Sequence, residues 1–392
     1  MKDLHRKIVP GLLDSFEDIK RIRRDIHRHP ELGYQEQRTS AIVADYLERW
    51  GYRVRRGVGG TGVVGTLQAG DGNRSIGLRA DMDALPISEA SGQSHSSVHE
   101  GVMHACGHDG HTATLLAAAK HLAATRAFSG TLNLIFQPAE EGGAGALAML
   151  NDGLFDHAPC DSVYALHNYP TPTLKFGQMA IGTGAIMASV DSLIVVVSGR
   201  GGHAASPEFT CDPIVAGAAI VQVLQTIVSR NVSPYRCAVV SVTSIHAGGA
   251  FNVIPGELEM KLSVRTYDEA LRSQVLTRIH DIVQAQAASF GANARVVEAA
   301  ARYPVLVNAE TAAQAAREVA TRHFGKDYVV VDHPPILAAD DFAFMAQKVP
   351  GCYINIGAGE GPALHNARYD FNDDLILVGG SFWVHLAQTL LR

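Results

Sequence analysis

Short apolar runs alternate with helical patterns along this 392-residue chain, and this alternation restricts its possible folds more than any other feature. A helix is predicted over residues 12–29, where Pro30 favours a boundary, and another over 37–50, where Gly51 favours a stop. Apolar runs bounded by glycine or polar residues predict strands at 62–67, 75–79, 131–136 and 162–166. Strands that alternate with helices predict an α/β fold with a mixed, largely parallel sheet covered on both faces.

The pattern changes near residue 186, and 392 residues exceed what one hydrophobic core usually holds. Strands are predicted over 190–198, 238–246 and 257–265, and helices over 212–230 and 271–288. This order predicts a compact α+β unit, a four-stranded antiparallel sheet with both helices on one face. A helix over 310–324, a strand over 352–356 and a helix over 378–391 follow. We therefore predict that residues 187–303 are inserted into a first domain formed by 1–186 and 304–392.

Composition and charge limit the partners and the cellular compartment expected for this protein. The net charge of −6 comes without a basic stripe, which argues against nucleic acid as a partner. Five cysteines without framework spacing indicate reduced thiols, and the charged N-terminal sequence indicates no signal peptide. The apolar segment 214–228 is interrupted by Gln222 and Gln225, so no membrane span is expected. These features predict a cytoplasmic protein.

The stretch Met103-His-Ala-Cys-Gly-His-Asp-Gly-His-Thr112 holds three histidines, a cysteine and an aspartate. Such donors in a glycine-bearing turn indicate a transition-metal site, and the alternative is a polar loop with a chance histidine cluster. Cys106 and His108 are too close to form half of a zinc finger, and no second cysteine pair follows. Any further ligands must therefore come from distant parts of the chain.

Polar groups follow three of the predicted strands, at the edge where functional groups gather in open α/β sheets. They are Asp81, Asp83, Glu140, Glu141 and His167. Any one of them alone could instead cap a helix or lie in a solvated loop.

Motifs spread over nearly the whole chain together resemble one family. They are Arg24-Asp-Ile-His-Arg-His-Pro-Glu-Leu-Gly33, Leu78-Arg-Ala-Asp-Met-Asp-Ala-Leu-Pro86, the stretch from Met103, Phe136-Gln-Pro-Ala-Glu-Glu-Gly-Gly143, Gly201-Gly-His-Ala-Ala205, Phe251-Asn-Val-Ile-Pro255, Leu364-His-Asn366 and Tyr369-Asp-Phe-Asn-Asp373. In this order they resemble the M20-type metallopeptidases, in particular the amidohydrolase branch of hippurate hydrolases, N-acyl-amino-acid amidohydrolases and auxin-conjugate hydrolases. The resemblance implies a zinc-peptidase-like catalytic domain and an inserted lid or dimerisation domain.

The resemblance also implies two divalent metal ions per subunit. A site with mixed thiolate, imidazole and carboxylate donors can bind Mn, Zn, Co or Ni. The implied ligands are Cys106, His108, Glu141, His167 and His365. A cysteine thiolate can bridge two metals as a carboxylate does, and nearby metal charge would keep it deprotonated. His104 and His111 are not matched to ligands; we expect His111 to support the site and His104 to be structural.

The implied reaction is hydrolysis of the amide bond of a small N-acyl amino acid by a metal-activated water. Adjacent side chains diverge, so Glu140 and Glu141 cannot serve the same role, and the resemblance implies Glu140 as the general base and Glu141 as the ligand. Asp83 would orient a ligating imidazole, and Asp81 would hold the same turn through hydrogen bonds.

The inserted unit contains a second set of matched residues. His203 would stabilise the tetrahedral oxyanion, within one chain or across a dimer; otherwise it is a surface turn histidine. Asn252 and Arg265 would hold the substrate carboxylate, although an arginine that ends an amphipathic strand is usually just solvated. The resemblance further implies a homodimer or homotetramer through this unit.

Two departures from the family pattern concern the surroundings of the site. Ala339-Asp-Asp-Phe342 replaces a common Ser-Glu-Asp-Phe; the Asp340 side chain is one methylene shorter than glutamate, so a contact from it to the ligands is not expected to carry over from the family. Glu208 follows Pro207 where relatives often have histidine.

Several other functions remain open. A dipeptidase, a carboxypeptidase or an N-carbamoyl-amino-acid hydrolase could use the same site. A cysteine-nucleophile amidase would use Cys106 with His108 or His111, and a binding protein would keep the fold without the chemistry. The acyl group, the amino acid and the native metal are not determined by the motifs.

Overall fold

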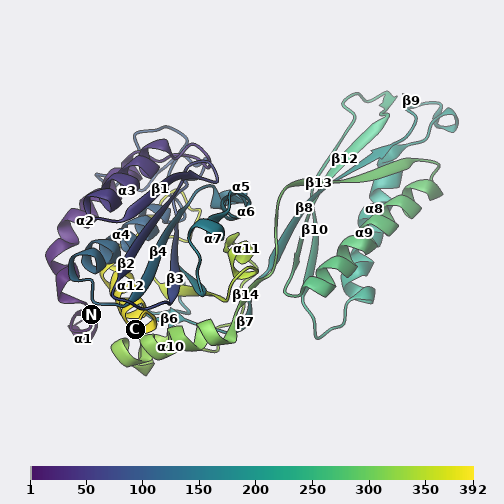
Figure 1. Ribbon diagram of the computed structural model, residues 1–392. Helices are drawn as coiled ribbons and strands as arrows, with labels where there is room; N and C mark the ends of the chain where they lie inside the picture. Colours follow the sequence, from purple (N-terminus) through teal and green to yellow (C-terminus); the bar gives the residue numbers. More distant parts are fainter. Residues whose placement is uncertain (1) are drawn as a thin grey trace. The chain divides into compact units, whose positions relative to one another are not determined.

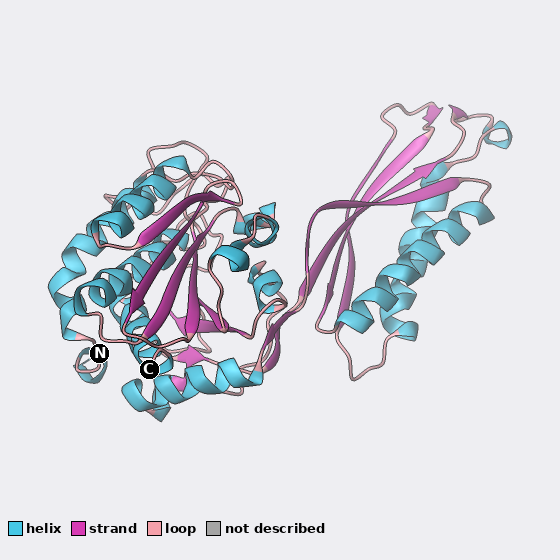
Figure 2. Cartoon of the chain, viewed as in Figure 1, coloured by secondary structure: helices cyan, strands magenta, loops and turns pink. Residues whose placement is uncertain are grey.

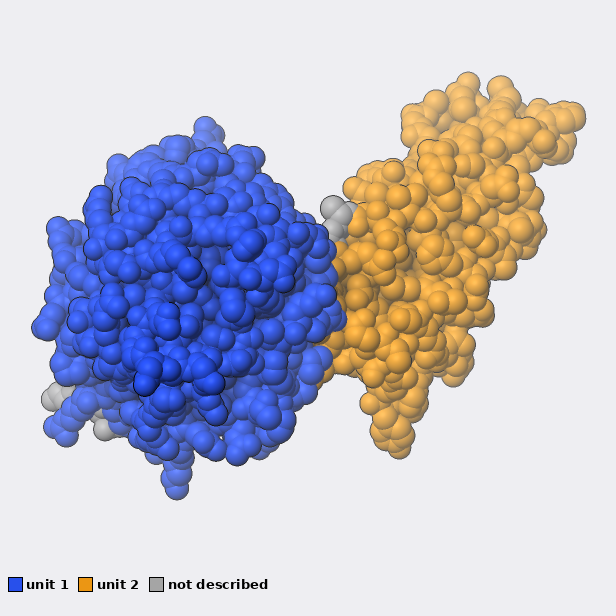
Figure 3. Space-filling view, in the orientation of Figure 1, with its two compact units in different colours: residues 1–184, 307–334, 341–392 blue, residues 185–306, 335–340 orange. Residues whose placement is uncertain are grey.

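A computed structural model describes residues 2–392, apart from the side chains of residues 2, 3, 300 and 301. The chain divides into two compact units, which Figure 3 distinguishes by colour. Unit 1 comprises Met1–Gly184, Val307–Pro334 and Asp341–Arg392, and unit 2 comprises Ala185–Leu306 and Pro335–Asp340. Unit 2 is therefore built mainly from a single inserted segment.

Unit 1 is built on an eight-stranded sheet with the order β1-β2-β4-β3-β5-β16-β6-β15 (Figure 1). The strands are β1 (Arg53–Val58), β2 (Gly62–Ala69), β3 (Ser75–Asp81), β4 (Gly130–Gln137), β5 (Ser162–Tyr169), β6 (Met179–Ala180), β15 (Val329–Val330) and β16 (Gly351–Gly357). The central strands β4, β3, β5 and β16 pair in parallel, whereas β1, β2 and the β16–β6 pair are antiparallel. The predicted mixed, largely parallel sheet is confirmed.

Helices cover both sides of this sheet, with α4 and α12 on one side and α6 and α11 on the other (Figure 1). The helices of unit 1 are α1 (Lys2–His5), α2 (Pro10–Arg28), α3 (Gln37–Arg49), α4 (His108–Thr125), α5 (Glu140–Gly143), α6 (Gly145–Asn151), α7 (Leu154–His157), α10 (Glu310–Phe324), α11 (Phe342–Ala346), α12 (Leu375–Leu390) and the 3₁₀ turn η3 (Lys326–Tyr328). As predicted, α2 ends just before Pro30 and α3 just before Gly51.

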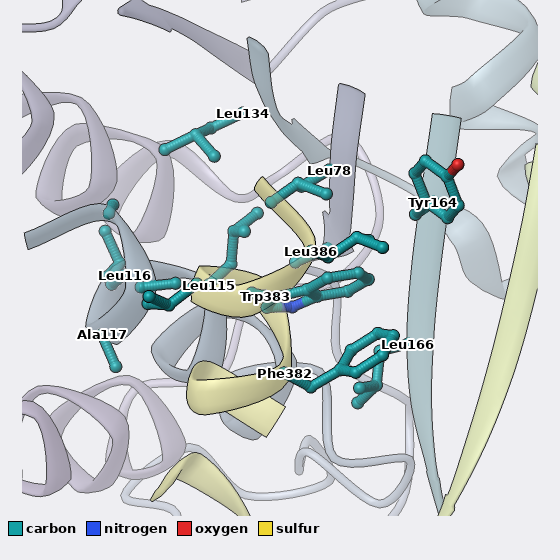
Figure 4. Packing of buried hydrophobic residues seen from close by; sticks show 14 of the residues in the cluster. Leu78, Leu115, Leu116, Ala117, Leu134, Tyr164, Leu166, Phe382, Trp383 and Leu386 are labelled. Atoms are coloured by element: carbon teal, nitrogen blue, oxygen red, sulfur yellow. The ribbon is translucent and has the colours of Figure 1, made fainter. Parts of the chain in front are cut away.

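The core of unit 1 lies where α4 and α12 pack against the sheet. Trp383 and Phe382 of α12 lie among leucines of α4 and of the strands (Figure 4). Close contact needs small residues on α12: a Cβ at Gly379 would lie 2.7 Å from Thr114, and one at Gly380 would lie 2.6 Å from Leu12. This packing fixes the N-terminus of α4, which contains part of the candidate site.

Unit 2 has a four-stranded antiparallel sheet with the order β10-β12-β8-β13, and helices α8 and α9 both cover one face (Figure 2). Its elements are β8 (Ser189–Ser198), β9 (Gly202–His203), η1 (Pro207–Phe209), α8 (Pro213–Thr226), the π-helical turn η2 (Ile227–Asn231), β10 (Ala238–Ala247), β11 (Val253–Ile254), β12 (Glu257–Thr266), α9 (Glu269–Ser289) and β13 (Asn293–Tyr303). Short strands β7 (Gly184–Met187) and β14 (Leu306–Asn308) pair with each other where the chain passes between units. The predicted sheet and helices are confirmed, and β13 is the fourth strand, which the apolar runs had not located.

Residues 335–340 depart from the predicted domain division, which placed them in the first domain. They belong to unit 2, because Ile336 forms a β-bridge with Met187 and accepts a hydrogen bond from the amide of Ala188 at 3.2 Å. The hydroxyl of Tyr267 also donates to the carbonyl of Pro335. Such backbone contacts leave no hydrophobic pattern in the sequence.

The helical segment Pro213–Asn231 agrees with the helix predicted over 212–230. By length and composition it could cross a membrane, although only one such helix was found among the described residues, and core helices meet the same criteria. Its inner face packs in the core of unit 2 through Ala216, Ile220, Leu224 and Ile227.

Candidate metal centre

The sheet order brings the five predicted ligands into one unit. Glu141 follows β4, His167 lies near the carboxyl end of β5, and Cys106 and His108 lie at the start of α4. His365 follows β16, in the left-handed region at φ 64°, and its amide donates to the carbonyl of Ala105 at 2.8 Å. Because β4, β3, β5 and β16 are parallel neighbours, their carboxyl ends meet at one edge of the sheet.

Distances between donor atoms are consistent with shared metal ligation. Cys106 Sγ lies 3.4 Å from His167 Nε2, and Glu141 Oε1 lies 3.2 Å from His365 Nε2 and 4.0 Å from His108 Nε2. Atoms bound to one ion at about 2.0–2.3 Å are separated by about this much. His108 Nε2 is also buried without a hydrogen-bond partner among the described residues. A buried unpaired nitrogen is costly unless a ligand satisfies it, so the donor set fits divalent metal.

Proton affinities at the site are strongly perturbed. Burial raises the pKa of the Cys106 thiol. Burial alone would lower the pKa of His108, but Asp81 and Cys106 raise it well above its ordinary value. Hydrogen bonds to Cys106 and Glu141 raise the pKa of His365 to about 10, whereas burial lowers that of His167 well below its ordinary value. The raised pKa values of Cys106, His108 and His365 favour protons at positions that a divalent cation would take, and metal binding would release those protons.

Asp83 contacts two of the predicted ligands at once. Its Oδ1 lies 3.2 Å from His108 Nδ1, and its Oδ2 accepts a hydrogen bond from the backbone amide of Glu141 at 2.9 Å. With Nδ1 held by the carboxylate, His108 presents Nε2 to the other donors, as metal-ligating histidines usually do.

Asp81 and His111 form a second layer behind the ligands. Asp81 Oδ1 lies 2.6 Å from His111 Nδ1, and His111 Nε2 contacts the side-chain oxygen of Asn168. The buried guanidinium of Arg79 donates to Asp81 Oδ2 at 2.7 Å and lies 3.3 Å from Asp341 Oδ1. Sequence pattern alone indicated no role for Arg79, Asn168 or Asp341. An arginine within an apolar strand was the available signal, because a buried charge requires partners.

His104 and Asp340 lie outside the ligand set. His104 is buried, both of its ring nitrogens lack a partner among the described residues, and burial lowers its pKa to about 4. It is therefore a neutral residue of the interior. Asp340 is buried at the end of the segment 335–340 of unit 2.

The three residues matched in unit 2 lie at two places. His203 pairs with Val253 across β9 and β11, and the amide of Ala204 donates to the carbonyl of Asn252 at 3.0 Å, so His203 and Asn252 are neighbours. Arg265 lies near the far end of β12, where its guanidinium donates to the carbonyl of Leu337 at 3.3 Å. At about 3.3 Å per residue, the length of β12 separates Arg265 from the His203 end by roughly 25 Å.

A buried ion network supports the N-terminus of α4 from behind. The carboxylate of Asp109, next to His108, lies 2.9 Å from His27 Nδ1 and 3.0 Å from Arg23 Nε, and Glu89 lies 3.3 Å from His27 Nε2. Burial alone would lower the pKa of His27, but Asp109 and Glu89 raise it to about 9.

This network predicts a stability change with pH. Because the folded pKa of His27 lies above its unfolded value, its contribution is complete below about pH 6.5 and is lost as the pH rises through about 9. Unfolding free energies at pH 6 and pH 9.5 are expected to differ by about 3 kcal/mol from this group. Comparing the pH dependence of the unfolding free energy in wild type and in His27→Gln separates the contribution of His27 from those of other titrating groups. An equal pH dependence in both proteins would refute the assignment.

The fold and the donor set define a two-unit α/β protein with a divalent-metal centre at the carboxyl edge of its sheet. The model of peptidase family M20/M25/M40 matches residues 77–389, and the chain belongs to this family. It is 43% identical over 389 residues to the hippurate hydrolase of Campylobacter jejuni, covering 98% of this chain and 100% of the relative. It is 37% identical to the N-acetyl-L-cysteine deacetylase of Bacillus subtilis, covering 94% and 87%.

A solved structure also supports membership of the M20 family. The YXEP protein of Bacillus subtilis, described as a dinuclear metal-binding peptidase of the M20 family, matches with a TM-score of 0.82 at 32% identity, covering 96% of this chain and 98% of that one. The resemblance drawn from the motifs is confirmed, as is the class of enzyme, a metal-dependent hydrolase.

Proposed function

We propose that this protein hydrolyses the amide bond of N-acyl amino acids with two divalent ions held by Cys106, His108, Glu141, His167 and His365. The observation that carries the proposal is the convergence of Cys106, His108 and Glu141, whose donor atoms all lie within 4.8 Å of one another, with His108 Nε2 buried and unpaired among the described residues. The named activities of the relatives, a hippurate hydrolase and an N-acetyl-L-cysteine deacetylase, indicate the substrate class.

The side chains of unit 1 provide for proton transfer. Divalent ions at such a site polarise the scissile carbonyl and acidify water. Glu140, buried in the loop next to the ligand Glu141, takes a proton from the attacking water as its oxygen bonds to the carbonyl carbon. The same carboxyl returns that proton to the amine nitrogen when the C–N bond breaks, so a carboxylate and a free amino acid result.

His203 is suited to donate a hydrogen bond to the oxyanion. Its Nδ1 accepts a hydrogen bond from the backbone amide of Ala205 at 3.1 Å, so the ring proton of the neutral form is on Nε2. The ring is exposed and can present that N–H to a substrate.

The separation within unit 2 supports the proposal of a homodimer. His203 and Asn252 lie at one end of unit 2 and Arg265 near the other, so residues from a single copy of this unit cannot all surround one small substrate. Two copies can do so if one supplies Arg265 and the other supplies His203 and Asn252.

A substrate panel tests the proposed function. Metal-free protein is loaded with Mn, Zn, Co or Ni and assayed on N-benzoyl, N-acetyl and N-carbamoyl amino acids, dipeptides, and N-acyl amines without a carboxylate. We expect kcat/KM for N-acyl amino acids to exceed that for the carboxylate-free amides about 30-fold, the value of a charge-assisted hydrogen bond. If no N-acyl amino acid is cleaved in a metal-dependent way, the proposal is refuted. Faster cleavage of dipeptides would indicate a dipeptidase.

A further inference from the structure

The loop that contains Glu140 has a backbone that needs external support. Ala139 and Ala144, on either side of Glu140–Gly143, have φ angles of 49° and 53°, in the left-handed region that is unfavourable for a non-glycine residue. Glu141 has non-helical backbone angles as well. A loop with these angles keeps its shape only if surrounding groups hold it.

The buried side chain of Glu36 holds the beginning of this loop. Glu36 precedes α3, far from the loop in sequence, and is fully buried. Its Oε1 accepts a hydrogen bond from the backbone amide of Ala139 at 2.8 Å, and its Oε2 accepts one from the hydroxyl of Thr61 at 2.5 Å. Oε1 therefore fixes the residue that directly precedes Glu140, while the hydrogen bond from Thr61 to Oε2 holds the carboxylate itself in place.

Tyr34 holds the end of the same loop. Its hydroxyl donates to the carbonyl of Gly143 at 2.6 Å, and its own φ of 63° is again left-handed. The ring lies close to the backbone of the loop: a Cβ at Gly143 would lie 3.1 Å from the Tyr34 ring, and one at Gly60 would lie 3.2 Å from it. Glycine at these two positions lets the ring approach.

We propose that Glu36 and Tyr34 are positioning residues for Glu140, an inference that rests on the proposed function. The backbone amide of Glu141 is held separately, by Asp83 Oδ2. Support for the general base and support for the metal ligand therefore come from different side chains, although the two glutamates are adjacent.

This separation matters because displacing Glu140 should impair proton transfer, whereas displacing Glu141 should impair metal binding. Proton transfer requires heavy atoms within about 2.6–3.2 Å, and a displacement of about 1 Å can reduce the rate 10²-fold. Loss of Glu36 or Tyr34 should consequently reduce kcat while KM and metal content stay close to wild type, whereas loss of Asp83 should reduce metal content.

The test compares Tyr34→Phe, Glu36→Ala and Glu36→Gln with wild type, with kcat normalised to folded, metal-loaded protein. We expect kcat to fall about fivefold in Tyr34→Phe and about 30-fold in Glu36→Ala, with KM within about twofold. Glu36→Gln keeps an acceptor for the Ala139 amide and a donor for the Thr61 oxygen, so it should restore kcat to within about threefold of wild type. Tyr52→Phe is the control for loss of a tyrosine hydroxyl, because it removes a hydrogen bond to the carbonyl of Ala119 away from this loop; Tyr52 is buried, whereas Tyr34 is exposed.

Amide hydrogen exchange gives a readout that does not depend on turnover. Peptides covering residues 136–145 should exchange faster in Tyr34→Phe than in Tyr52→Phe. Wild-type kcat in folded Glu36→Ala, or equal exchange in the two tyrosine variants, would overturn the inference, as would loss of metal in parallel with kcat. If Glu36→Ala does not fold, Tyr34→Phe still decides. An inactive wild type with faster exchange in Tyr34→Phe would refute the proposed function but not the anchoring of the loop.

Discussion

Glu140→Gln is expected to reduce kcat by about 10²–10⁴-fold, because the amide cannot take the proton of the attacking water or return it to the leaving amine. The glutamine has nearly the shape of the buried glutamate, so folding should be little changed. Metal content should also remain at the wild-type level, since the proposed ligand is the neighbouring Glu141. The measurements are steady-state kinetics on the best N-acyl amino acid and metal analysis of the purified protein.

The adjacent glutamate provides the informative comparison for this variant. Glu141→Gln should lose metal content as well as activity, because Glu141 Oε1 faces His108 and His365. Glu100→Gln, at an exposed position of unit 1, controls for the change of charge. Full turnover in Glu140→Gln would show that the base is another group.

Removal of the metal ions should abolish activity, and divalent metal should restore it. Exhaustive chelation is expected to leave less than about 1% of the wild-type rate, because the metal both polarises the carbonyl and acidifies water. Cys106→Ala should reduce metal content and turnover together, since Cys106 Sγ lies among the donors His108, Glu141 and His167. Both effects are followed by metal analysis and by activity after titration with Mn, Zn, Co or Ni.

The same experiment separates metal catalysis from a cysteine nucleophile. Cys237→Ala is the control, because Cys237 is an exposed free cysteine. It should leave metal content and rate unchanged. If the chelated protein kept its activity and lost it only on thiol alkylation, Cys106 would be the nucleophile and the metal proposal would be wrong.

Much of this molecule follows from local sequence pattern. The two-residue period of β12 predicts that Leu258, Met260, Leu262 and Val264 share a face, and all four are buried. The apolar runs likewise locate the central strands of unit 1. The weakly apolar β1 was not located, because an edge strand with mostly exposed side chains lacks such a signal.

The chemistry of the candidate site is also largely encoded in the sequence. The stretch around Cys106, the adjacent pair Glu140–Glu141 and His167 after an apolar run are all local features, and the family resemblance adds His365. Local order also predicts that polar groups after parallel strands gather at one edge of the sheet.

Only the tertiary structure decided which groups support the predicted ligands and the proposed base. One Asp83 carboxylate contacts both His108 and Glu141, Glu36 reaches Ala139 across 103 positions of the chain, and residues 335–340 join unit 2. The physical reason is that periodicity determines the face on which a side chain lies, whereas its partner depends on strand order and loop conformation. Hydrogen bonds between segments so far apart form only when the whole of unit 1 has folded.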